Sequence, residues 1–185
     1  MLLYRVFAWL RTAAEGEPGH ALYVPELQGA GRADNVGRYR ALYVSSAAAG
    51  AIAEAFGNLK VWTPRMLLRP DLPGSVRSLG AYVVSDDPAI FDLDDAQALA
   101  TLGLRPSQVV TRDREVTQRW ALAIYEQRRW IGVRWWSYYD PRWYSYAFWD
   151  LAALTPQLNR IQPLTIDHPA IVEACEVLRR PRRSR

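Results

Sequence analysis

The stretch RALYVSSAAAGAIAEAFGN, residues 40–58, decides the fold of this chain. Residues 40–44 include Leu, Tyr and Val, which are typical of a strand. Residues 47–56 are almost all strong helix formers. Ser45 or Ser46 can cap this helix, because a serine oxygen accepts hydrogen bonds from the exposed amides of a first turn. The stretch therefore predicts a strand that passes directly into a helix of small, closely packing residues.

Patterns on both sides of this stretch predict the remaining elements. Strands are expected at 3–9, 76–84, 131–138 and 144–149, the last two joined through Asp140-Pro141, with a further strand near Leu164. Helices are expected from the Asp92–Asp95 segment to Gly103, at 113–127, and at 169–178 with Pro169 in the first turn; Gly57-Asn58 ends the helix quoted above. The order lacks a regular βαβ rhythm, which favours an α+β fold with mostly antiparallel mixed sheets and flanking helices. We expect one domain over residues 1–178 and a disordered basic tail over 179–185.

Composition narrows the classes of function. Five of the 23 Lys and Arg residues lie in 179–185, which leaves 18 basic residues against 19 acidic ones in the body of the chain. A nearly neutral body argues against direct nucleic-acid binding, which needs a basic face on the fold. Cys175 is the single cysteine, and His20 and His168 lie far apart, so neither a disulfide nor a metal site is expected.

Nothing in the sequence predicts secretion or membrane insertion. Arg5 follows the start of the chain too soon for the apolar core of a signal peptide. No apolar run reaches the roughly 20 residues that a membrane helix needs. The expected location is therefore the cytoplasm.

Three polar residues are candidates for a functional site, each with an ordinary alternative. Glu54 lies among small helix residues. Its carboxylate is either held in a protected site or exposed on the surface like most glutamates. Arg32 follows Gly29-Ala30-Gly31 and either grips a phosphate or carboxylate through its guanidinium fork or is one more surface arginine among 22. Ser137 lies in an aromatic segment, 130–149, which forms either core strands or one wall of a pocket.

A serine-hydrolase triad has little support. Asp167 and His168 are adjacent, and neighbouring residues of a strand point to opposite faces. Ser137 also lacks the Gly-x-Ser-x-Gly elbow of many such enzymes.

Four blocks of the sequence resemble the RES domain family, named for its Arg, Glu and Ser. They are Gly31-Arg32-Ala33-Asp34-Asn35, which matches a Gly-Arg-x-x-Asn loop; Leu42-Tyr43-Val44-Ser45 followed by Ala53-Glu54; Thr117-Gln118 with the strand that carries Ser137; and His168 to Ala174. Two positions depart from the family pattern. Ala33 replaces an aromatic residue, so that the Arg38-Tyr39 pair competes with Arg32, and Trp136 replaces a proline before Ser137.

The resemblance implies a bacterial toxin that depletes NAD by hydrolysis or phosphorolysis, with a fold like that of ADP-ribosyltransferase toxins. It implies that Glu54, Arg32 and Ser137 are catalytic and that Arg32, Tyr43, Asn35 and Ser137 bind NAD, without a metal. It also implies an Xre-like helix-turn-helix antitoxin that covers the active site, and it is compatible with a homodimer inside a larger complex.

Two rival functions remain open from the sequence. The first is an ADP-ribosyltransferase that uses the same site to modify a protein. The second is a non-enzymatic binding module, in which the aromatic strands form an interface and the Arg-Tyr-Glu spacing is a coincidence.

Overall fold

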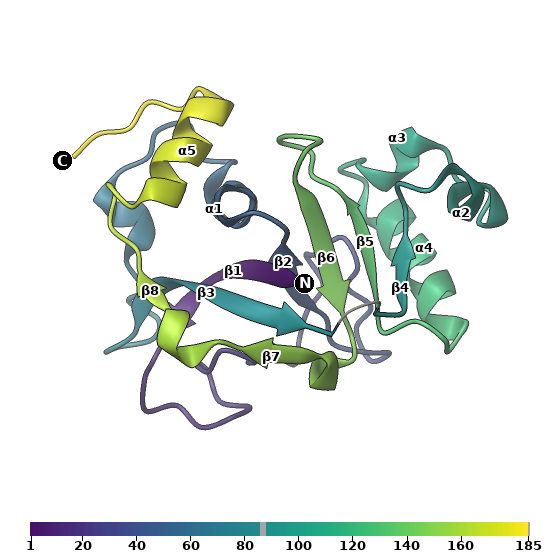
Figure 1. Ribbon diagram of the computed structural model, residues 1–185, viewed down its shortest axis with the longest axis horizontal. Helices are drawn as coiled ribbons and strands as arrows, with labels where there is room; N and C mark the ends of the chain where they lie inside the picture. The colour runs from purple at the N-terminus through teal and green to yellow at the C-terminus, as the bar shows by residue number, and fades with distance from the viewer. Residues whose placement is uncertain (86–87, 185) are drawn as a thin grey trace.

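The computed structural model describes residues 1–85 and 88–184. Within them the chain forms one curled sheet of eight strands with helices on its flanks (Figure 1). The strands are β1 (Leu2–Trp9), β2 (Leu42–Ser45), β3 (Val76–Val84), β4 (Ile90–Asp92), β5 (Gly132–Trp136), β6 (Tyr144–Phe148), β7 (Leu154–Pro156) and β8 (Gln162–Pro163). The helices are α1 (Ala48–Phe56), α2 (Ala96–Thr101), α3 (Pro106–Val109), α4 (Arg114–Glu126) and α5 (Pro169–Leu178).

The sheet has two halves that meet at one narrow joint. Its order is β4-β5-β6-β2-β1-β3-β7, with β8 also pairing β3. β1 pairs antiparallel with β3 along its whole length, but with β2 only at Tyr4↔Ser45. All pairs are antiparallel except β4 with β5. The predicted α+β class with mostly antiparallel pairing is confirmed.

Each half of the sheet has its own helices and a core cluster beneath them, and a third cluster joins the two halves. In Figure 1, α1 and α5 lie together near β1, whereas α2, α3 and α4 lie at the other end beside β4 and β5. One core joins α1 to α5 and includes Ile52, Phe56, Trp62 and Ile171. A second core joins α4 to β5 through Trp120, Ile124, Val133 and Trp135. The aromatic segment 130–149 therefore supplies mainly core residues, the first of the two alternatives above.

The start of α1 differs from the prediction. Ala47 precedes the helix and no side chain caps it. Ser45 and Ser46 instead bond to the start of β6, because Ser45 Oγ donates to Tyr144 O at 3.2 Å and Ser46 Oγ accepts from Tyr144 N at 2.8 Å. The expected serine cap was wrong because this neighbouring strand uses both hydroxyls.

Other boundaries follow the sequence closely, with short elements missed. β3 has the expected bounds, and Asp95 and Asp113 cap α2 and α4 with their carboxylates. β5 ends at Trp136, so Ser137 lies just beyond the strand, and β8 stops before Leu164. β4, β7 and α3 were not predicted because three or four residues are too few to show a period.

The C-terminal segment makes more contacts than a disordered tail would. Trp62 N donates to Pro181 O at 3.0 Å, and Arg183 N donates to Trp62 O at 2.9 Å. Arg180 Nη2 donates to Gly57 O at 3.0 Å, directly after α1. The reason is that residues 180–183 pair with the backbone of the buried Trp62, where Arg182 and Trp62 form a parallel β-bridge. Arg185, the last residue of the predicted tail, lies outside the described residues.

Across the described ranges, every helix is too short or too polar to cross a membrane.

Candidate active site

A cavity of about 370 Å³ lies where the two halves of the sheet separate. Tyr4, Arg5 and Val6 of β1 line one side, and Tyr43, Val44 and Ser45 of β2 line another. α1, β5, β6, the loop at 31–32 and the start of α4 complete the wall. The volume lies within the range of about 300–1,000 Å³ that small-molecule sites occupy.

Glu54 lines this cavity from α1. Its Oε1 accepts hydrogen bonds from Ser137 Oγ at 2.7 Å and from Ser145 Oγ at 3.2 Å. The residue is exposed, whereas both serines are buried, at 2% and 4% exposure. The carboxylate is therefore held in place from behind and open to the cavity in front.

Small residues allow α1 to approach the strands this closely. A Cβ on Gly50 would lie 2.4 Å from Ser45 Oγ, and one on Gly57 would lie 2.5 Å from the ring of Tyr139. A side chain at either position would push the helix away. The placement of Glu54 thus depends on Gly50 within α1 and on Gly57 directly after it.

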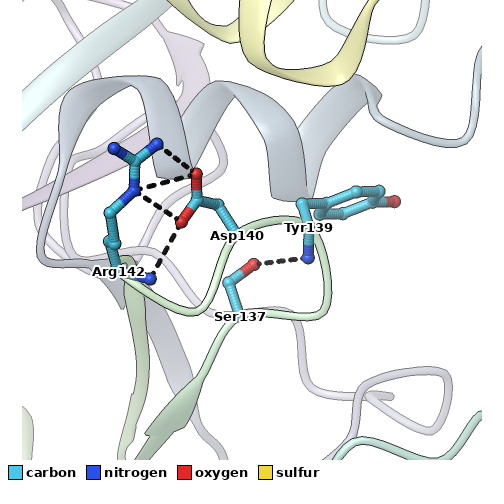
Figure 2. Close-up of polar contacts among 4 residues, drawn as sticks. All are labelled: Ser137, Tyr139, Asp140 and Arg142. Atoms are coloured by element: carbon cyan, nitrogen blue, oxygen red, sulfur yellow. Dashed lines mark hydrogen bonds and ion pairs between the residues drawn. The ribbon is translucent and has the colours of Figure 1, made fainter.

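The turn that carries Ser137 is fixed by its own polar contacts (Figure 2). Ser137 Oγ accepts from Tyr139 N at 3.2 Å while it donates to Glu54. Asp140 accepts from the backbone N of Arg142 at 2.9 Å and from its guanidinium Nη2 at 2.6 Å. The Arg142 guanidinium holds the pKa of the Asp140 carboxyl below its usual range. Ser137 is consequently a rigid support for Glu54, and it is not itself among the cavity-lining residues.

The loop at 29–35 is closed around the hydroxyl of Tyr43. This hydroxyl donates to Asp34 Oδ1 at 2.6 Å and accepts from Ala33 N at 2.9 Å. Burial and the charge of Asp34 raise the pKa of Tyr43, so the phenol keeps its proton. A Cβ on Gly31 would lie 2.4 Å from the same hydroxyl, so only glycine fits. Gln118 of α4 holds the loop from outside, with its Nε2 donating to Gly29 O and Gly31 O.

Arg32 belongs to this loop and lines the cavity. Its Nη1 donates to Val109 O at 2.6 Å and to Thr111 O at 2.7 Å, which fixes the guanidinium plane. Burial and the nearby charge of Arg114 lower the pKa of Arg32 to about 10, partly offset by Glu54. Arg32 therefore remains cationic at neutral pH. Arg32 and Arg114 line the same cavity as Glu54, an arrangement suited to an anionic ligand with a reacting centre near the carboxylate.

The remaining predicted residues lie outside the cavity lining. Asn35 Nδ2 donates to Tyr39 Oη at 2.9 Å and to Gln118 O at 3.0 Å, so this side chain braces the loop. Arg38 forms an exposed ion pair with Glu126 at 2.5 Å. Of the two arginines that competed in the sequence, Arg32 is the one that lines the cavity.

The cavity residues that the sequence reasoning missed include Ser145, Trp135 and Arg114. Ser145 faces Glu54 from β6, directly opposite Trp135 of β5, which also lines the cavity. Arg114 is the first residue of α4 and its Nε donates to Ala30 O at 3.0 Å. The one available signal was the pair of consecutive predicted strands, 131–138 and 144–149. If these strands pair with each other, Ser137 and Ser145 lie in facing strands.

Within 1–85 and 88–184, no three His, Cys, Asp or Glu residues are grouped so that they could hold a metal ion.

A family model described as RES domain matches residues 2–171. A search of curated proteins finds no significant match. The chain is similar in structure to a chain of the M. tuberculosis MbcT-MbcA toxin-antitoxin complex, with a TM-score of 0.54 and 18% identity over 89% of this chain and 81% of that one.

Proposed function

The chain belongs to the RES domain family, and from this premise we propose that it is an enzyme that cleaves the bond between nicotinamide and ribose in NAD. One observation carries the proposal. The carboxylate of Glu54, supported by Ser137, and the guanidinium of Arg32 line one cavity of about 370 Å³. This reaction needs a carboxylate that stabilises the cationic sugar and a cation that binds the diphosphate.

Arg32 and Arg114 bind the diphosphate of NAD in this proposal. A guanidinium group pairs with phosphate oxygens through two parallel hydrogen bonds. The carbonyls of Val109 and Thr111 hold Arg32 in place before the ligand arrives. Anchoring at the diphosphate positions the scissile bond, and positioning lowers the barrier.

Glu54 stabilises the sugar as the bond breaks. The electron pair of the C–N bond passes to the nicotinamide ring nitrogen, which leaves neutral and needs no acid. The ribose then carries positive charge, as in other glycosyl transfers. A preorganised charge of this kind contributes about 3–4 kcal/mol. Water adds to the anomeric carbon and loses one proton, giving ADP-ribose; phosphate as the acceptor gives ADP-ribose 1-phosphate.

Tyr43 has a supporting part in this scheme. Its hydroxyl is already occupied by Asp34 and Ala33, so it contributes its ring to the cavity wall beside Trp135, with ring centroids 6.4 Å apart. Aromatic faces of this kind suit a flat ligand ring. Asn35 acts as a positioning residue for the loop.

We also propose that the protein is the toxin of a toxin–antitoxin pair and acts in the cytoplasm. The similar M. tuberculosis chain comes from such a complex. The exposure of Glu54 leaves the cavity accessible to a covering segment, such as one from an Xre-like helix-turn-helix antitoxin.

The test is to incubate the purified protein with NAD and to separate the products. Release of nicotinamide together with ADP-ribose or ADP-ribose 1-phosphate supports the proposal and identifies the acceptor. With NAD labelled in its adenosine half, label attached to protein would favour ADP-ribosyl transfer instead. Intact NAD, together with normal cell growth after induced expression, would favour a binding module.

A further inference from the structure

A second cavity, also of about 370 Å³, adjoins the first along β1. Tyr4, Arg5 and Val6 line the first cavity, and residues 5–8 line the second, so Arg5 and Val6 belong to both. β1 pairs with β2 only at Tyr4, and in the described chain no strand covers this edge from Arg5 onward. The two cavities therefore follow one another along β1 beyond the single pairing that joins the halves of the sheet.

The second cavity is cationic. Arg5, Arg69 and Arg77 line it, and Asp71 is the one carboxylate among its described lining residues. Arg69 forms an ion pair with Asp71, which is mostly exposed. Arg5 donates to the carbonyls of Ala21 at 3.1 Å and Tyr23 at 3.0 Å. The second cavity is thus lined by three guanidinium groups and one carboxylate, which gives it a net positive charge.

Arg77 is the least satisfied of the three. Its Nε is buried and has no hydrogen-bond partner in the described chain. Its guanidinium lies over the ring of Phe56, 5.8 Å from the centroid. Burial, together with the charge of Arg69, lowers the pKa of Arg77. A partly buried cation with an unpartnered Nε is costly unless an anion offsets its charge, and an arginine fork matches a phosphate in shape and charge.

We propose that this second cavity is a binding site for a phosphate group, with Arg77 as its central contact. Two sources share this chemistry. One is the adenylate half of the dinucleotide, reaching along β1 from the first cavity; this source rests on the proposed function. The other is free inorganic phosphate, and this source does not depend on the proposed function.

The test uses calorimetric titration of the protein at fixed ionic strength with three probes: inorganic phosphate, 5′-AMP and adenosine 2′,5′-bisphosphate. We expect saturable binding that Arg77→Gln weakens about tenfold or more, since it removes a charge-assisted contact. Arg160→Gln, at an exposed surface position outside the cavity, should leave it unchanged. Equal affinity for all three probes indicates a free-anion site, whereas tighter binding of the adenosine probes indicates the adenylate half.

A second variant guards against misfolding, because Arg77→Gln also alters packing on Phe56. Asp71→Asn removes the exposed carboxylate of the cavity and should tighten binding several-fold. Absence of binding by all three probes, or binding that neither variant changes, overturns the proposal. The readout is binding alone, so it stands apart from whether the protein turns over NAD.

Discussion

The cavity has two walls that are built in different ways. The arginine wall, formed by the loop at 29–35 and the start of α4, is held mainly by backbone groups: Val109 O and Thr111 O fix Arg32, and Ala30 O fixes Arg114. The carboxylate wall is held by side chains, since the hydroxyls of Ser137 and Ser145 fix Glu54.

Because of this difference, substitutions in the two walls should affect different properties of the protein. Changes in the arginine wall disturb a closed loop and should affect ligand binding and stability together. Changes in the carboxylate wall remove single groups from an otherwise intact frame and should affect turnover alone.

Glu54→Gln should reduce the turnover of NAD about 10²- to 10³-fold, the range for the loss of one preorganised electrostatic group. The glutamine oxygen can still accept from Ser137, so the fold should be preserved. NAD consumption by the purified variant measures the effect, with Glu176→Gln on the exposed surface of α5 as the matched control. Undiminished turnover would remove Glu54 from the mechanism.

Arg32→Ala should raise the KM for NAD about 10- to 100-fold, because charge-assisted hydrogen bonds to the diphosphate are lost. Titration of the Glu54→Gln protein with NAD, with and without Arg32→Ala, isolates binding from turnover. An unchanged affinity would contradict the anchoring role of Arg32.

Ser137→Ala should lower kcat about tenfold and leave KM nearly unchanged, since its hydroxyl supports Glu54 at 2.7 Å and does not line the cavity. Ser145→Ala should have a smaller effect because its bond to Glu54 is longer, at 3.2 Å. Steady-state kinetics on both variants would reveal the difference. A main effect on KM would indicate that Ser137 contacts the substrate.

Gly31→Ala should lower the free energy of unfolding by about 1–3 kcal/mol, because the new methyl group would overlap the Tyr43 hydroxyl. Thermal denaturation measures the loss. In the same loop, Gly29→Ala is the control, since its Cβ would meet only a Val36 methyl group at an ordinary 3.6 Å. Equal melting temperatures for the two variants would mean that the loop is not tightly closed.

Arg38→Ala should have the smallest effect. Both partners of its ion pair with Glu126 are about half exposed, and such pairs contribute about 0–1 kcal/mol. NAD affinity comparable to that of the unmodified protein would separate Arg38 from Arg32. A loss as large as that of Arg32→Ala would reverse the choice between them.

Much of the fold could be predicted from local patterns. β1, β3, α4 and α5 follow from strand-favouring composition, capping aspartates and Pro169. The site could be predicted only as separate residues. The partners that fix Arg32 lie 77 and 79 residues away, and Ser137 lies 83 residues from Glu54. Such pairings depend on how strands assemble, which no local pattern contains.

Two details show contacts that local reasoning does not reveal. Ser45 and Ser46 have the composition of a helix cap, but β6 uses their hydroxyls. Asn35 stays a predicted NAD-binding residue, and in the structure its amide donates to Tyr39 and to Gln118 O of α4. In both cases a distant segment competes for a polar group that the sequence offers locally.

The most direct test is a crystal structure of the Glu54→Gln protein with NAD. The account predicts NAD in the cavity between the two walls, with its diphosphate at Arg32 and Arg114 and the anomeric carbon of the nicotinamide ribose beside residue 54. Clear density for NAD at another place on the protein, with this cavity empty, would contradict it.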